Sequence, residues 1–169
     1  MKPDFTLRHG WRPGDLGWVI AEHGRYYDRA WQLGAVFEAK VAEAMGEWMQ
    51  RYDPARDLLL LAEDVEGPLG SISLDGSGPH VAVDGARIRF FIMADKARGR
   101  GIGKALMAEM MTFIASAGLD EAFLTTFRGL YAARKLYEDN GWVLTREALD
   151  TSWGMPLHEQ RFDWKRKSN

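Results

Sequence analysis

The residues most suggestive of chemistry lie in one glycine-dense segment, 98–104, which reads Arg-Gly-Arg-Gly-Ile-Gly-Lys. An apolar, strand-like run ends shortly before it at Met93, and a helix-like pattern follows from Lys104 to Ala117. Glycine has no Cβ, so a ligand can approach this backbone closely, and the free N–H groups at the start of a helix attract anions. The segment therefore predicts a turn that binds phosphate, with a pyrophosphate as the best-fitting ligand.

The spacing of the glycines discriminates between the known kinds of phosphate-binding turn. A dinucleotide-binding G-x-G-x-x-G motif would need its third glycine where Lys104 stands. A P-loop would need Ser or Thr after that lysine, but Ala105 follows it. The pattern that does fit is R-x-x-G-x-G, formed by Arg98, Gly101 and Gly103.

This pattern resembles the pyrophosphate-binding motif of the GNAT N-acetyltransferases, which use acetyl-coenzyme A. In that family the strand before the motif lies along the pantetheine arm and offers a backbone N–H to the acetyl oxygen. The resemblance implies acetyl-coenzyme A as cosubstrate and no metal. The cofactor-binding residues that it implies are Phe91, Ile92, Met93, Arg98, Gly99, Arg100, Gly101, Ile102, Gly103, Lys104 and Tyr137.

A second segment, from Ala133 to Trp142, resembles the A-x-x-L-Y-x-x-x-G-F pattern of the same family, with Trp in place of Phe. Tyr137 occupies the position of the motif tyrosine, which implies a general acid that protonates the sulfur of coenzyme A. A tyrosine on the apolar face of a helix can instead be a core residue without a catalytic role. Leu130 stands where many relatives carry an asparagine that contacts the cofactor arm.

The N-terminal half extends the resemblance to a subgroup. Segments 12–20, 23–24 and 37–42 are similar to the acetyltransferase half of bacterial proteins in which a MarR-type DNA-binding domain precedes a GNAT domain. The implied fold is α+β, with a mixed, mostly antiparallel sheet of about six to seven strands and helices on both faces. We expect residues 1–169 to form a single N-acetyltransferase domain.

The acceptor site is less well defined by the sequence. Strand alternation places Arg89 on the same face as Phe91 and Met93, where it could pair with the carboxylate of an amino-acid-like amine. An internal ion pair with Glu63 or Asp64 is an equally good explanation. Two further candidates for substrate binding are Trp153 and Glu38. The candidates for a general base that removes the amine proton are Glu38, Glu43, Glu47, Glu63 and His23, and the enzyme could also work without a dedicated base.

Composition limits the possible functions. The chain contains no cysteine, which excludes disulfides and a cysteine acyl-enzyme, and its net charge of −2 argues against nucleic acid as a main partner. It has no apolar run long enough for a membrane span and opens without a signal-peptide pattern, so we expect a cytoplasmic protein, monomeric or homodimeric. The predicted activity is acetyl transfer to a primary amine of a small molecule, amino acids included. The alternatives are a protein-lysine acetyltransferase and a non-catalytic acyl-coenzyme A sensor or partner protein.

Apolar periodicity and turn residues predict the elements that would position these groups. We expect a short helix that begins at Asp15 and stops at Gly24, and a longer one over 33–50. The remaining predicted helices follow the two motifs. Strands are expected at 5–8, 58–63, 69–74, a run ending at 93, 122–127, 142–146 and 160–166.

Overall fold

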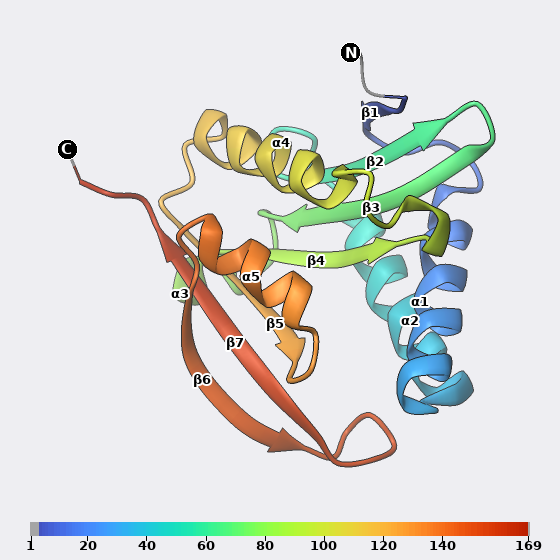
Figure 1. Ribbon diagram of the computed structural model, residues 1–169. Helices are drawn as coiled ribbons and strands as arrows, with labels where there is room; N and C mark the ends of the chain where they lie inside the picture. The colour runs from blue at the N-terminus through green and yellow to red at the C-terminus, as the bar shows by residue number, and fades with distance from the viewer. Residues whose placement is uncertain (1–3, 169) are drawn as a thin grey trace.

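The computed structural model describes residues 4–168, which form one seven-stranded sheet with helices on both faces (Figure 1). The strands are β1 (Thr6–His9), β2 (Leu58–Asp64), β3 (Gly67–Asp75), β4 (Ala86–Met93), β5 (Glu121–Phe127), β6 (Val143–Asp150) and β7 (Leu157–Lys165). The helices are α1 (Asp15–Trp31), α2 (Gly34–Gln50), the short α3 (Val81–Asp84), α4 (Ile102–Ser116) and α5 (Tyr131–Asp139), with a 3₁₀ turn at Asp95–Ala97. The predicted α+β class is confirmed.

The strand order is β1-β2-β3-β4-β5-β7-β6, and every neighbouring pair is antiparallel except β4 and β5. The parallel pair is brief: only Ala86–Ala122 and Arg87–Phe123 are in register. Beyond these residues the two strands diverge, and Figure 1 shows β5, β7 and β6 running away from β1–β4 at a steep angle. The sheet therefore opens into a wedge between β4 and β5.

Two apolar cores lie on the two faces of the sheet. The five-residue run Leu58–Ala62 is fully buried because β2 is covered on both sides, and its side chains alternate between the cores. One core contains α4 together with Tyr137 of α5 and Trp142, and the other contains residues of α1 and α2. Both helix pairs are thereby fixed against β1–β4, with the wedge between them.

Helix α1 is longer than the sequence predicted, because Gly24 does not end it. The helix continues to Trp31 and is closed by Gln32, whose φ of 56° places it in the left-handed region. A Cβ at position 24 would lie 2.6 Å from a carboxylate oxygen of Glu38 on α2. Gly24 is therefore a position where α1 and α2 approach closely, and the helix-stop interpretation was wrong.

Strand β4 contains a β-bulge that the strict alternation did not anticipate. Its register with β3 shifts between Ser71 and Ser73, and Phe90 has a φ of 52°, unusual for a residue with a side chain. The Ser71 hydroxyl donates to the Phe90 carbonyl at 2.8 Å. After the bulge Phe91 packs with the α4/α5 core, while Phe90 packs with the α1/α2 core. Arg89 and Phe91 therefore do not share a face, and that part of the prediction was wrong.

Candidate active site

The wedge between β4 and β5 holds a cavity of about 1010 Å³, which reaches from the glycine-rich turn to the far side of the sheet. Strands β4 and β5 form its walls, α4 and α5 flank one end, and α1 and α2 flank the other. Because β5 does not pair with β4 beyond Arg87, the backbone edge of β4 from Ile88 onward faces this space. A long ligand could pass through the sheet here and contact both ends of the cavity.

The glycine-rich turn forms one mouth of the cavity. Gly99 and Gly101 have φ values of 76° and 75°, which side-chain-bearing residues rarely adopt, and α4 begins directly afterwards at Ile102. Gly103, in the first turn of α4, lines the cavity together with both of these glycines. The turn thus offers unpaired helix N–H groups and a backbone free of Cβ atoms, which fits a pyrophosphate.

Of the three cationic side chains in this segment, two line the cavity. Arg98 and Lys104 lie on its wall and are exposed. Arg100 does not line it, because its guanidinium is paired with Asp64 at 3.2 Å and with Asp4 at 2.8 Å. The assignment of the Arg100 side chain to the cofactor site is therefore corrected: this arginine ties the turn to the end of β2.

The free edge of β4 supplies backbone donors. Ala94 donates to Leu69 on β3 at 2.8 Å, and N–H groups alternate between the two edges of a strand. The N–H groups of Met93 and Phe91 therefore point away from β3, toward the side on which β5 has diverged. Ile92 lies between them and also lines the cavity.

Tyr137 lies on the cavity wall beneath this edge. Its ring centroid is 6.3 Å from that of Phe91 and 5.6 Å from that of Phe162. Burial raises the pKa of its phenol well above the usual value, so the hydroxyl keeps its proton at neutral pH. Tyr27 of α1 lines the same cavity from the α1/α2 side of the sheet, and burial raises the pKa of its phenol as well.

None of the four glutamates suggested by the sequence lines the cavity. Glu38 is exposed on α2 and packs against Gly24, while the other three lie elsewhere on the surface or in ion pairs; these are Glu43, Glu47 and Glu63. His23 does line it. Its Nδ1 lies 2.8 Å from the Val19 carbonyl, and burial lowers its pKa to about 4, so the ring is neutral at pH 7.

Comparison with known proteins is consistent with this geometry. The family described as Acetyltransferase (GNAT) family matches residues 17–142, about three-quarters of the chain. The chain belongs to the GNAT acetyltransferase family. A search of curated proteins finds no significant match.

Solved structures share this GNAT fold at low sequence identity. A ribosomal-protein-alanine N-acetyltransferase from Brucella melitensis is 18% identical with a TM-score of 0.75, covering 95% of this chain and 99% of its own. Spermidine N-acetyltransferase from Vibrio cholerae, in complex with CoA and spermine, is 16% identical with a TM-score of 0.67, covering 96% and 95%. The protein yncA from Salmonella typhimurium, with its cofactor acetyl-CoA, is 12% identical with a TM-score of 0.71, covering 98% and 95%.

Arg89 lies on the wall of the GNAT cavity, but its guanidinium is already engaged. Its Nη1 is 3.4 Å from Oδ2 of Asp75, whose side chain has no exposed surface. The sequence offered Glu63 or Asp64 as partners, and the structure supplies a different carboxylate, because Asp75 ends the neighbouring strand β3. Arg51, directly after α2, binds the same carboxylate at 2.6 Å.

Trp153, the predicted pocket-wall residue, does line the cavity. Its ring centroid is 5.3 Å from that of Phe37 and 5.4 Å from that of Phe127. The loop between β6 and β7 is held over α2, because Lys40 contacts the Ser152 carbonyl and lies 5.2 Å from the Trp153 ring. This loop closes the end of the cavity beside α1 and α2 with an aromatic wall.

Glu159 of β7 and Arg87 of β4 are charged residues that also line the cavity and were not predicted from the sequence. Glu159 was missed because the final strand was predicted to start at 160, whereas β7 begins at Leu157 and directs Glu159 to the face of Phe127. Burial, with Asp150 nearby, raises the pKa of Glu159 above the usual value. Strand alternation, which puts Arg87 on the face of Arg89, was the signal that could have found the arginine.

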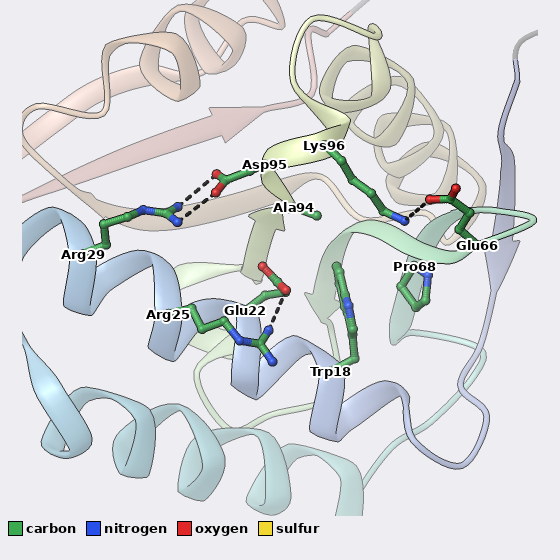
Figure 2. A pocket seen from close by; sticks show the side chains of 9 residues that line it. All are labelled: Trp18, Glu22, Arg25, Arg29, Glu66, Pro68, Ala94, Asp95 and Lys96. Carbon is green, nitrogen blue, oxygen red and sulfur yellow. Dashed lines mark hydrogen bonds and ion pairs between the residues drawn. The ribbon is translucent and has the colours of Figure 1, made fainter.

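A second, smaller cavity of about 420 Å³ lies between α1 and the turn after β4 (Figure 2). Its charged side chains are already paired with one another: Arg25 with Glu22, Arg29 with Asp95, and Lys96 with Glu66. Figure 2 shows that the first pair lies within α1, the second joins α1 to the turn after β4, and the third joins that turn to the one between β2 and β3, which indicates a structural role.

Two further features of residues 4–168 bear on the expectations from sequence. None of the helices described is long and apolar enough to cross a membrane. Within the same part of the chain, no cluster of three or more His, Cys, Asp or Glu side chains is arranged as a metal site.

Proposed function

We propose that this GNAT protein transfers an acetyl group from acetyl-coenzyme A directly to the primary amine of a small molecule, amino-acid-like amines included. The observation that carries the proposal is the single cavity that joins the glycine-rich turn to the wedge between β4 and β5, with the Tyr137 phenol on its wall. The resemblance to the acetyltransferase half of MarR–GNAT proteins remains a prediction about subgroup.

The residues of the turn would bind the cosubstrate. The backbone of Gly99, Gly101 and Gly103 would receive the pyrophosphate at the N-terminus of α4, with Arg98 and Lys104 supplying positive charge at the cavity mouth. When bound, acetyl-coenzyme A would supply an activated thioester.

The cavity wall would then meet the chemical demands of acyl transfer. The Met93 and Phe91 N–H groups on the free edge of β4 would stabilise the negative charge that develops on the acetyl oxygen. The Tyr137 hydroxyl holds a proton that it can donate to a departing sulfur, because burial keeps the phenol protonated. Glu159 would accept the amine proton in place of Glu38, because the other carboxylate of the lining, Asp139, is paired with Lys135.

The proposal is tested by release of free thiol from acetyl-coenzyme A in the presence of a panel of amines. The panel should contain amino acids, their decarboxylated amines, polyamines and a lysine-containing peptide. Thiol release that requires a small amine supports the proposal. Release with the peptide alone would indicate a protein acetyltransferase, and binding of coenzyme A without release with any amine would indicate a sensor.

A further inference from the structure

Arg87 is a cationic side chain on the cavity wall that forms no direct ion pair within residues 4–168, although Glu159 on the same wall is near enough for their charges to interact. It lies in β4, and its Nη2 donates to the Thr125 hydroxyl on β5 at 3.1 Å. Its guanidinium carbon is 5.6 Å from the centroid of Phe123. Its Nε is shielded from solvent and has no hydrogen-bond partner within residues 4–168, and no carboxylate there forms an ion pair with it.

The neighbouring arginines differ from Arg87 in this respect. Three other arginines of this region are each committed to carboxylates of the protein itself. Arg51 and Arg89 bind Asp75 at 2.6 and 3.4 Å, and Arg161 binds Asp84 and Asp163 at 2.9 and 2.8 Å. Arg87 is thus the member of the group with donors left for a ligand.

The position of Arg87 at the apex of the wedge directs those donors toward an acceptor. Arg87 and Phe123 are the last residues in register before β4 and β5 diverge, so the guanidinium lies at the closed end of the opening. The bulge at Phe90 is three residues further along β4, about 10 Å at the rise of a strand. The arginine side chain and a small amine bound to it are together long enough to reach from the Arg87 backbone to the bulge at Phe90.

A partly buried arginine without a direct ion pair is costly to the fold, and an anion bound to it would reduce the cost. The pyrophosphate of the cosubstrate is expected at the other end of the cavity, at the turn of residues 99–103. Glu159 interacts with Arg87 but forms no ion pair with it, so the anion that would bind Arg87 directly is assigned to the acceptor. A guanidinium presents two parallel N–H groups, which match the two oxygens of a carboxylate.

Resting on the proposed function, we propose that Arg87 is the anion-binding subsite of the acceptor, so that the enzyme acetylates amines that carry a carboxylate close to the nitrogen. Arg89, held by Asp75, stiffens β4 beside the subsite and does not itself bind the carboxylate. Glu159, on the same wall, faces the remainder of the acceptor.

The test compares amino acids with the amines that lack their carboxylate, using the pairs L-phenylalanine and phenethylamine, and L-tryptophan and tryptamine. We expect the unmodified enzyme to favour the carboxylate member in kcat/KM. Arg87→Gln should reduce that preference by about 10- to 100-fold, as for loss of hydrogen bonds to a charged group, while hardly changing kcat/KM for the decarboxylated member. In Arg87→Lys, which keeps the charge without the planar fork, the preference for the carboxylate member should lie between those of the unmodified enzyme and Arg87→Gln.

The matched control is Arg161→Gln, which removes one positive charge from the same sheet face at a residue that does not line the cavity. It should leave the preference unchanged. An equal loss for both members of each pair in Arg87→Gln, with an unaltered preference, would overturn the subsite.

A binding measurement separates this proposal from the proposed function. N-acetyl-L-phenylalanine retains the carboxylate and lacks a reactive amine, so calorimetry can follow its binding without turnover. We expect Arg87→Gln to weaken its binding at least tenfold, with circular dichroism unchanged. Weakened binding in a protein that acetylates no amine would support the subsite and overturn the proposed function; undetectable or equal binding in both proteins would overturn the subsite.

Discussion

The guanidinium of Arg89 lies 3.4 Å from the carboxylate of Asp75, whose side chain is completely buried. The same carboxylate binds Arg51 at 2.6 Å and accepts the backbone N–H of Gly78 at 3.2 Å. It therefore connects α2, β4 and the loop after β3 at one point. Burial alone would raise the pKa of Asp75, but the hydrogen bond from Arg51 and the charges of His80, Arg51 and Arg89 hold it below its usual value.

Asp75→Asn should destabilise the protein by about 3 kcal/mol at pH 7, because it leaves Arg89 without a counter-ion and Arg51 with only the exposed Glu47. Urea unfolding measures this. The control is Glu47→Gln, which removes an exposed partner of Arg51 and should cost less than about 1 kcal/mol. Since the pKa of Asp75 is lowered by folding, its stabilisation is present at neutral pH and is lost as the pH falls through the lowered pKa. Equal losses in the two variants at pH 7 would contradict this role.

Gly103→Asp should lower the affinity for coenzyme A at least tenfold, because it adds a negative charge where a pyrophosphate is expected. The matched control is Gly103→Ala. A Cβ at this position would be 3.8 Å from atoms of Leu136 and Phe91, an ordinary contact, so both variants should fold. Calorimetry with coenzyme A gives the affinities, and thermal melting checks the fold. Unchanged affinity in the aspartate variant would place the pyrophosphate elsewhere.

Much of the fold could be predicted because its signals are local. The apolar run at 58–62, the helical periodicity of 34–50 and the glycines of the turn each indicate their element within a few residues of sequence. The end of α1 could not be predicted in this way. Gly24 is a typical helix-stop residue, and its true role, close contact with Glu38, depends on the packing of a second helix.

In the candidate site, too, residues in local motifs could be predicted, whereas residues brought together by tertiary packing could not. The glycine-rich turn and Tyr137 were found from motifs, and both line the cavity. At the other end of the cavity, Arg89 and Trp153 were predicted and line it, but the face shared by Arg89 and Phe91 was predicted wrongly, because the bulge at Phe90 ends the period-two pattern. Glu159 and Arg87 come from strands that are distant in sequence and become neighbours only across the splayed sheet.

His23 should make stability sensitive to mild acid. Burial lowers its pKa to about 4, whereas an exposed histidine titrates near 6.5, so the unfolded chain takes up a proton first as the pH falls. The free energy of unfolding should drop by about 2 kcal/mol between pH 7.5 and pH 5 from this residue. In His23→Phe the drop should be smaller by that amount, whatever the variant's stability at pH 7.5. Parallel pH profiles for the two proteins would contradict the buried, neutral state.

Tyr137→Phe tests the general acid directly, because it removes one oxygen and keeps the ring packed against Phe91 and Phe162. If the hydroxyl protonates the departing sulfur, kcat should fall by about 10²-fold, while the affinity for acetyl-coenzyme A and the melting temperature change little. The matched control is Tyr52→Phe, which deletes a phenol oxygen that accepts the Leu59 N–H at 3.4 Å, outside the cavity lining. It should retain the original kcat. Measurements at saturating acceptor, with chemistry established as rate-limiting by single turnover, decide the matter: a near-native kcat in Tyr137→Phe would make this tyrosine a core residue.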